Sequence, residues 1–294
     1  MTVLKKRIGI GIGADPEKVI ANACSVNIPC DIVCYCRPGT ASVPPGNSHV
    51  NLAESTDPGA ALVADLMAGT LQAAVRGDLR GEVTLKVLEA AAGVSRLERV
   101  ALLETARGKK FMFAPVGIAE GWTVSEKLAL IRKGRVLARR FGLPEKVGVI
   151  SGGSLNAPGW YPACDRSMAD AELVAKLGDA EHFGLYIEDA IKSCGLIIAP
   201  DGITGNFIFR TLEYLGAGYG HGAPVVNIDK IFIDTSHAQQ SYTNALMLAA
   251  SLLDDGWSPF TGTVPRTPRI TPSPSNSPIR STIAGDFLPP IDAN

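Results

Sequence analysis

Residues 7–17 read Arg-Ile-Gly-Ile-Gly-Ile-Gly-Ala-Asp-Pro-Glu, and this stretch decides the fold class. The alternation of isoleucine and glycine predicts a buried strand that ends in a glycine turn. Asp15, Pro16 and Glu17 predict a helix start, because they supply a cap, a proline at the first helical position and an acid in the first turn. The segment is therefore expected to form a strand, a turn and the beginning of a helix.

The same alternation continues along the chain. Strands are expected at residues 31–36, 71–75, 100–104, 110–114, 147–150, 195–199, 225–228 and 231–233. Helices are expected at residues 58–67, 84–92, 123–141, 168–177, 186–193, 207–215 and 242–253. This order predicts an α/β protein with mostly parallel sheets that helices cover on both faces, and with the loops after the strands gathered at one edge.

Composition restricts the partners of the protein. The 294 residues are 46% hydrophobic and 19% charged, which is ample material for a core. No run reaches the roughly 18 apolar residues of a membrane span, and the basic start at residues 1–7 lacks the apolar segment of a signal peptide. A cytoplasmic protein is therefore expected. The net charge of −1 and the lack of a long basic run argue against nucleic-acid binding.

Six cysteines raise the question of a metal site. Cys30, Cys34 and Cys36 are closely spaced, but no Cys-x-x-Cys pair accompanies them. Cys34 and Cys36 fall on one face of the strand expected at 31–36, where a cysteine usually serves as a small apolar residue. Buried structural cysteines are favoured over metal ligands. Residues 257–294 are rich in Pro, Ser and Thr without periodicity, so a disordered tail is expected there.

The first candidate site is the loop from Arg76 to Gly81, Arg-Gly-Asp-Leu-Arg-Gly, which follows an apolar strand. Arg76 and Arg80 suit a phosphate or carboxylate held in bidentate fashion, and Asp78 is placed to orient one of them. A turn with solvated charges is the alternative.

The second candidate runs from Asp201 to Asn206, Asp-Gly-Ile-Thr-Gly-Asn. Its glycines, Gly205 among them, let the backbone approach a ligand, and a following helix offers free N–H groups. Thr204 and Asn206 add polar side chains. The alternative is an ordinary strand-to-helix connection with Asn206 as the N-cap.

Two weaker candidates follow other strands. Ser151, Gly152, Gly153 and Ser154 offer hydroxyls around a flexible backbone, which suits an anion as well as a plain loop. In residues 234–237, Asp-Thr-Ser-His, a proton-transfer role for His237 competes with a structural one. The glycines of residues 9–13 lack the strict Gly-x-Gly-x-x-Gly pattern, which argues against NAD binding.

These loops, in this order, resemble the phosphate acetyl/butyryl transferase family over roughly residues 70–253. The apolar run 196–199 with Pro200, Asp201, Gly205 and Asn206 looks like that family's strand and helix start. The resemblance implies two α/β domains, in a fold shared with isocitrate and isopropylmalate dehydrogenases, with the active cleft between them. Carried over, the first domain covers 1–143 plus 236–256 and the second covers 144–235.

The resemblance also has departures. The family's Ser-Arg-Gly triplet reads Ser236-His237-Ala238, so the arginine expected to hold an acyl phosphate is replaced by histidine. Among relatives with this loss, the passages 75–81 and 200–206 resemble the methanogenesis marker 4 family, also labelled as methyltransferase subunit MtxX. That likeness implies an archaeal methanogen and a link to methyl transfer.

Together these expectations define a transferase of the phosphotransacetylase scaffold that binds a small phosphorylated or coenzyme-like anion in the cleft, coenzyme A or a methanogen coenzyme. His237, Asp201 and Ser236 are the catalytic candidates, and the Arg76, Ser151 and Thr204 loops are expected to bind substrate. A non-catalytic ligand-binding or assembly factor and an acyl-phosphate acyltransferase are the alternatives. The resemblance further implies a homodimer, and neither a metal nor a membrane is expected as a partner.

Overall fold

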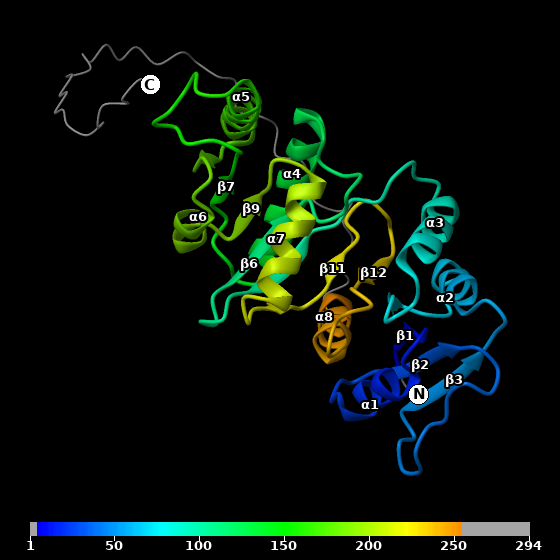
Figure 1. Ribbon diagram of the computed structural model, residues 1–294. Helices are drawn as coiled ribbons and strands as arrows, with labels where there is room; N and C mark the ends of the chain where they lie inside the picture. The colour runs from blue at the N-terminus through cyan, green and yellow to red at the C-terminus, as the bar shows by residue number, and fades with distance from the viewer. Residues whose placement is uncertain (1–4, 255–294) are drawn as a thin grey trace, which may run out of the picture. The chain divides into compact units, whose positions relative to one another are not determined.

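A computed structural model describes residues 5–254 of the protein, the side chain of Asp254 excepted. Within these residues two six-stranded sheets are surrounded by helices (Figure 1). The predicted α/β class with mostly parallel sheets is therefore confirmed. The tail predicted at 257–294 lies outside the described residues.

The first sheet has the strand order β11-β12-β4-β1-β2-β3. Its strands are β1 (Arg7–Gly11), β2 (Asp31–Cys36), β3 (Val50–Glu54), β4 (Ala73–Val75), β11 (Ala223–Pro224) and β12 (Ile231–Asp234). All neighbours are parallel except β11 and β12. Strands β4 and β12 lie side by side, so the loops that follow them begin at the same edge of the sheet.

Four helices cover the first sheet: α1 (Pro16–Ser25), α2 (Pro58–Met67), α3 (Gly81–Ala92) and α8 (Thr243–Asp254). Helices α1 and α8 contact each other on one face, where Ile8, Ile10 and Cys34 point. Helices α2 and α3 pack together on the opposite face, where Tyr35 and Phe232 point. Helix α8 thus returns the end of the described chain to the sheet that contains β1.

The second sheet has the order β10-β5-β6-β9-β7-β8. Its strands are β5 (Ala101–Glu104), β6 (Lys110–Ala114), β7 (Val147–Val149), β8 (Glu181–His182), β9 (Leu196–Ile198) and β10 (Tyr219–Gly220). Its helices are α4 (Val124–Arg140), α5 (Pro162–Gly178), α6 (Ile187–Ser193) and α7 (Gly202–Tyr214). Helices α4 and α5 pack on one face of this sheet, and α6 and α7 pack on the other.

Local sequence explains where many helices begin. The Asp15 carboxylate accepts a hydrogen bond from the Lys18 N–H and Asp57 one from the Ala60 N–H, and a proline follows each cap. Helix α4 starts with a capping box in which the Thr123 hydroxyl and the Glu126 carboxylate each accept from the other residue's N–H. These signals span at most three residues, so they can be read without tertiary information.

Several expected elements differ from the structure. The strand predicted at 225–228 is wrong, because the pairing lies at β11 and Val225 makes only an isolated bridge to Arg99. Helix α7 begins at Gly202 and not at Phe207, because Asp201, not Asn206, is its N-cap. The two-residue strands β8 and β10 were not predicted, since such short runs carry little periodic signal, and β3 was not predicted because only its first residue is buried.

The division of the chain between the two sheets does not follow the expected domain boundaries. Strands β5 and β6 precede residue 144 but belong to the second sheet, and β12 precedes residue 236 but belongs to the first. All described residues form one compact unit. The two-domain boundaries remain a prediction.

The cysteines behave as the strand pattern predicted. Cys34 and Cys36 lie in β2, are buried, and share the face that packs against α1. Burial raises the pKa of the Cys34 thiol to about 12, so this side chain stays neutral and apolar. Among residues 5–254, no helix is long and apolar enough to cross a bilayer.

Candidate functional site

A cavity of about 650 Å³ lies between elements of the two sheets. Its walls come from α3, the start of the β6–α4 connection, α7 and the loop between β12 and α8. This volume is in the range of sites for small molecules. The polar residues that line it are Arg76, Glu82, Lys86, Glu89, Arg99, Asn206, Arg210, Asp234, Thr235, Ser236, His237 and Gln239; Leu85, Ala101, Val116, Ile118, Phe209 and Ala223 form apolar walls.

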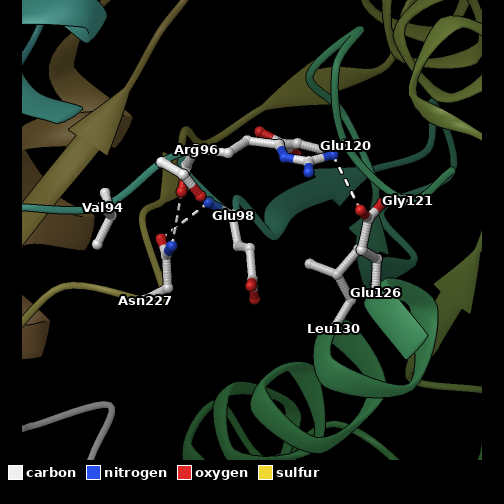
Figure 2. A pocket seen from close by; sticks show the side chains of 9 residues that line it. Val94, Arg96, Glu98, Glu120, Gly121, Glu126, Leu130 and Asn227 are labelled. Carbon is white, nitrogen blue, oxygen red and sulfur yellow. Dashed lines mark hydrogen bonds and ion pairs between the residues drawn. The ribbon is translucent and has the colours of Figure 1, made fainter. Parts of the chain in front are cut away.

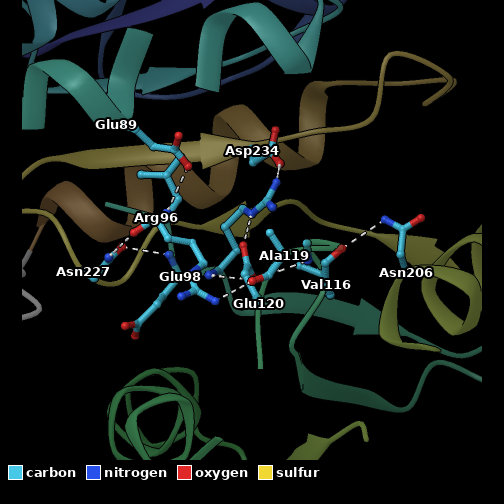
Figure 3. A network of polar contacts seen from close by, with 12 residues as sticks. Glu89, Arg96, Glu98, Val116, Ala119, Glu120, Asn206, Asn227 and Asp234 are labelled. Atoms are coloured by element: carbon cyan, nitrogen blue, oxygen red, sulfur yellow. Dashed lines mark hydrogen bonds and ion pairs between the residues drawn. The ribbon is translucent and has the colours of Figure 1, made fainter. Parts of the chain in front are cut away.

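A buried chain of ion pairs runs from the cavity wall, where Arg76, Arg99 and Asp234 lie, to Glu120; Figure 3 shows its two carboxylates, Asp234 and Glu120. Arg76 Nε donates to Asp234 Oδ1 at 2.5 Å, and Arg99 Nη1 donates to Asp234 Oδ2 at 2.5 Å. Arg99 Nε donates to Glu120 Oε1 at 2.6 Å. Two guanidiniums and two carboxylates therefore balance each other, and the first sheet is joined to residues that flank the second.

Burial and pairing set the charge states of this chain. Burial raises the pKa of Asp234, but the adjacent Arg76 and Arg99 lower it by more, so it lies below its ordinary value. For Arg99, burial lowers the pKa while Glu120 and Asp234 raise it above its ordinary value. The pKa of Glu120 is raised, mainly because its carboxyl group is buried. Asp234 and Arg99 are thus charged at neutral pH.

Arg76 lines the cavity, but most of its guanidinium is already hydrogen-bonded within the protein. Besides the bond to Asp234, its Nη1 donates to the Leu79 carbonyl. Only Nη2 has no hydrogen-bond partner among the described residues. The expected bidentate grip on a ligand would therefore require displacement of an internal partner.

Asp78 and Arg80 were predicted to bind substrate, but the structure places both outside the cavity. The buried Asp78 carboxylate accepts from the N–H groups of Gly13 and Asp15, at 2.5 and 2.6 Å, so it fills the start of α1, where an anion would bind. Arg80 is the N-cap residue of α3. Its side chain is 82% exposed, and its Nη2 lies 3.6 Å from Glu82 Oε2. Neither residue lines the cavity.

The segment from Asp201 to Asn206 is the first turn of α7. Asp201 accepts from Thr204 N and from Thr204 Oγ1, so both side chains serve the helix cap. Gly205 is required by packing, since a Cβ would lie 1.9 Å from the Pro115 carbonyl oxygen. Asn206 alone lines the cavity, where its Nδ2 donates to the Val116 carbonyl at 3.0 Å (Figure 3).

Ser236 and His237 line the same cavity from the loop between β12 and α8. The Ser236 Oγ accepts from the Ala238 N–H, which leaves its hydroxyl proton to donate. His237 is exposed, and its carbonyl accepts from the Tyr242 hydroxyl. The structure therefore brings Arg76, Asn206, Ser236 and His237 to one cavity from three separate elements.

Residues 151–154 lie at the carboxyl end of β7 in the second sheet and do not line this cavity. Ser151 is buried and hydrogen-bonded to His182, Gly152 donates its N–H to Ser167 Oγ, and Ser154 lies 3.4 Å from the Tyr186 hydroxyl.

Sequence reasoning missed several residues of the site. Arg99 and Glu120 carry no motif, and only the fold brings them to Asp234. Lys86 and Arg210 occupy exposed positions of α3 and α7 that read as solvated helix faces. One signal was available: an Asp at the end of an apolar strand, like Asp234, usually has a buried cationic partner.

A second cavity, of about 310 Å³, is lined by Glu120 of this ion-pair chain (Figure 2). Glu120 lines it together with Arg96, Glu98 and Asn227. Asn227 Nδ2 donates to the Arg96 carbonyl and its Oδ1 accepts from the Glu98 N–H, which fixes this wall. Its charged groups are already paired, as Glu98 is with Lys133 at 2.5 Å.

Comparison with curated proteins decides the family. The chain is 42% identical over 210 residues to the "Putative methyltransferase mtx subunit X" of Methanosarcina barkeri, covering 70% of this chain and 78% of that protein. It is 44% identical over 204 residues to the protein of the same name from Methanosarcina mazei, covering 68% and 73%. The chain belongs to this mtx subunit X family. No family model matches.

An uncharacterized methyltransferase of Methanopyrus kandleri is 37% identical over 220 residues, covering 70% of this chain and 84% of that protein. Among solved structures, a branched-chain phosphotransacylase from Enterococcus faecalis aligns with a TM-score of 0.66 at 18% identity, covering 84% and 98%. A phosphotransacetylase from Staphylococcus aureus aligns at 0.61 with 13% identity, covering 84% and 94%. These structures show that this mtx subunit X relative has the phosphotransacylase fold.

Proposed function

We propose that this protein is a transferase of methanogenesis, a methyltransferase by its family's name, that binds a small anionic or coenzyme-like substrate in the 650 Å³ cavity. One observation carries the proposal. Arg76, Asn206, Ser236 and His237 come from separate stretches of sequence, and all four line one cavity of ligand size.

The cavity residues suit distinct roles. Lys86 has no carboxylate at ion-pair distance among the described residues, so its ammonium group is available to an anion. The Ser236 hydroxyl and the Asn206 amide would position the ligand, and the apolar walls around Phe209 would hold an uncharged part of it. Rate enhancement would come mainly from orientation and fixed charges.

Proton transfer is assigned to His237. Its imidazole is exposed at the cavity, and imidazole is the side chain that most often serves as a general acid or base. Asp201 is a poorer candidate, because both of its oxygens already accept from Thr204.

The test is a thermal-shift and calorimetric titration of the full chain with coenzyme A, acetyl phosphate, S-adenosylmethionine and methanogen coenzymes. A ligand of the folded state raises the melting temperature. Lys86→Ala is expected to weaken its binding about tenfold, which is about 1.4 kcal/mol. The matched control is Lys192→Ala, at an exposed lysine of α6 outside the cavity. No shift with any ligand, or equal affinity in both variants, would count against the proposal.

Two alternatives remain testable in the same preparation. A non-catalytic binding or assembly factor is favoured by the internal pairing of Arg76 and Arg99, both of which donate to Asp234. An acyltransferase is favoured by the fold and by Ser236 at the cavity. Binding without turnover would support the first, and acetyl transfer from acetyl phosphate to coenzyme A would support the second. We also propose a homodimer, which light scattering would test.

A further inference from the structure

A serine, a histidine and a glutamate lie in line, away from the cavity described above. His182 Nε2 is 2.9 Å from Ser151 Oγ, and His182 Nδ1 is 3.1 Å from Glu172 Oε2. None of the three lines the 650 Å³ cavity. Such a set is recognised by its geometry, since its members come together in space and not in sequence.

The chemistry of the carboxylate fixes the direction of the hydrogen bonds. An ionised Glu172 can only accept, so His182 Nδ1 carries the ring proton of the neutral imidazole. Nε2 is then the acceptor that faces the Ser151 hydroxyl. The contact of Ser151 Oγ with the Gly153 carbonyl, at 3.5 Å, is at the limit of a hydrogen bond. The serine is therefore directed at a base whose tautomer is set by an acid.

Regular elements position all three residues. His182 lies in β8, which pairs with β7 through Val149, and Ser151 follows β7 by two residues. The Ser151 N–H donates to the Gly184 carbonyl at 2.7 Å, which fixes the serine backbone. Glu172 projects from α5, a helix that packs on both strands. The His182 side chain is only 3% exposed, so its orientation is held by packing.

The surroundings offer the other parts that acyl transfer needs. The N–H groups of Gly153 and Ser154, which follow the serine, donate to no acceptor among the described residues and are the candidates for stabilising a developing oxyanion. Large apolar side chains are exposed along the same loop and beside it: Leu155, Trp160, Tyr161 and Leu185. Leu155 lies against Gly184, next to Leu185. An apolar acyl group would find partners there.

Ser151 is 4% exposed, so a substrate reaches its hydroxyl only when the following loop moves. Residues 152–161 form no helix or strand, and they include Gly152, Gly153 and Gly159. Displacement of this loop would uncover the serine and would move Leu155, Trp160 and Tyr161 with it.

We infer that Ser151, His182 and Glu172 form a nucleophilic site that hydrolyses carboxylic esters with an apolar acyl group. The Ser151 oxygen attacks the carbonyl carbon while its proton passes to His182 Nε2. The bond to the alcohol oxygen then breaks, and the imidazolium gives that proton to the leaving alcohol. Water repeats the sequence on the acyl-serine and releases the carboxylic acid. Glu172 is a positioning residue, because it acts through the imidazole.

The experiment treats the full chain with a fluorophosphonate probe, which phosphonylates an activated serine oxygen with loss of fluoride. Peptide mass spectrometry locates the label, and p-nitrophenyl butyrate reports hydrolysis. Wild-type protein is expected to carry the label on Ser151. Ser151→Ala and His182→Gln are expected to lower the hydrolysis rate at least about 10³-fold, and Glu172→Gln by less.

Ser193→Ala is the matched control, an exposed serine of α6 in the same half of the fold. It is expected to retain labelling and hydrolysis. Melting curves distinguish lost chemistry from lost folding. Folded wild-type protein that takes no label, or a label that persists in folded Ser151→Ala, would overturn the inference. Neither readout depends on a ligand in the 650 Å³ cavity, so this result is separate from the fate of the proposed transferase.

Discussion

Replacing Asp234 by asparagine tests the ion-pair chain at the cavity wall. The carboxylate accepts from Arg76 and from Arg99, each at 2.5 Å, and the Asp234 side chain is 11% exposed. The amide removes one negative charge, which leaves Arg99 paired with Glu120 but Arg76 with only the Leu79 carbonyl as its acceptor. Breaking a buried pair in this way typically costs roughly 3–5 kcal/mol, because a desolvated charge loses its partner.

The expected fall in the melting temperature follows from that range. For a domain of this size, each kcal/mol lowers the melting temperature by roughly 2–4 °C, so Asp234→Asn is expected to lower it by roughly 6–20 °C. The matched control is Asp189→Asn, the same change at a carboxylate that pairs with Lys192 on the surface and whose side chain is 52% exposed. No measurable change is expected there.

The pH dependence supplies a second check. Burial raises the pKa of Asp234, but Arg76 and Arg99 lower it below the unfolded value by a larger amount. Its stabilisation is therefore fully present above the unfolded pKa, about 3.9, and is lost as the pH falls through the lower folded pKa. Denaturant titrations from pH 7 to pH 3 should show wild type and variant converging only in acid. Equal losses in Asp234→Asn and Asp189→Asn at pH 7 would refute the reasoning.

Three further predictions concern stability. Gly77→Ala should lower the free energy of unfolding by at least about 3 kcal/mol, because φ is +65° and a Cβ would lie 2.0 Å from the Gly11 carbonyl oxygen. Gly142→Ala also has a positive φ but has open space around it, so it should lower the free energy of unfolding by only about 1–2 kcal/mol. Denaturant titration measures both. Asn22→Ala should lower the free energy of unfolding by about 1–3 kcal/mol in the same assay, because the Asn22 side-chain oxygen caps α8 by accepting from the Tyr242 N–H at 2.8 Å. An unchanged denaturation midpoint would contradict this prediction. Burial raises the pKa of Glu213 to about 7, so wild-type stability should fall as the pH rises from 4.5 to 7. Glu213→Gln should remove that dependence, and the same slope in both proteins would exclude this effect.

Much of the fold could be predicted because its signals are local. The strand at Asp31–Cys36 and the helix at Pro58–Met67 have the predicted bounds, since a continuous apolar run and an Asp-Pro cap lie within a few residues. The edge strand Val50–Glu54 escaped prediction, because only its first residue is buried. The predicted start of helix α7 lies five residues after its observed start at Gly202, because the glycines and Asp201 are compatible both with a loop and with a capped first turn.

The sequence by itself determined the α/β class and the family, because both rest on the order of strands, caps and motifs along the chain. Tertiary structure alone decided which polar residues meet. Asp78 is turned to the start of α1, and Asp234 joins Arg76 and Arg99 from sequence positions 158 and 135 residues away. Hydrogen bonds and ion pairs act over a few ångströms, so such partnerships exist only after the sheets have assembled.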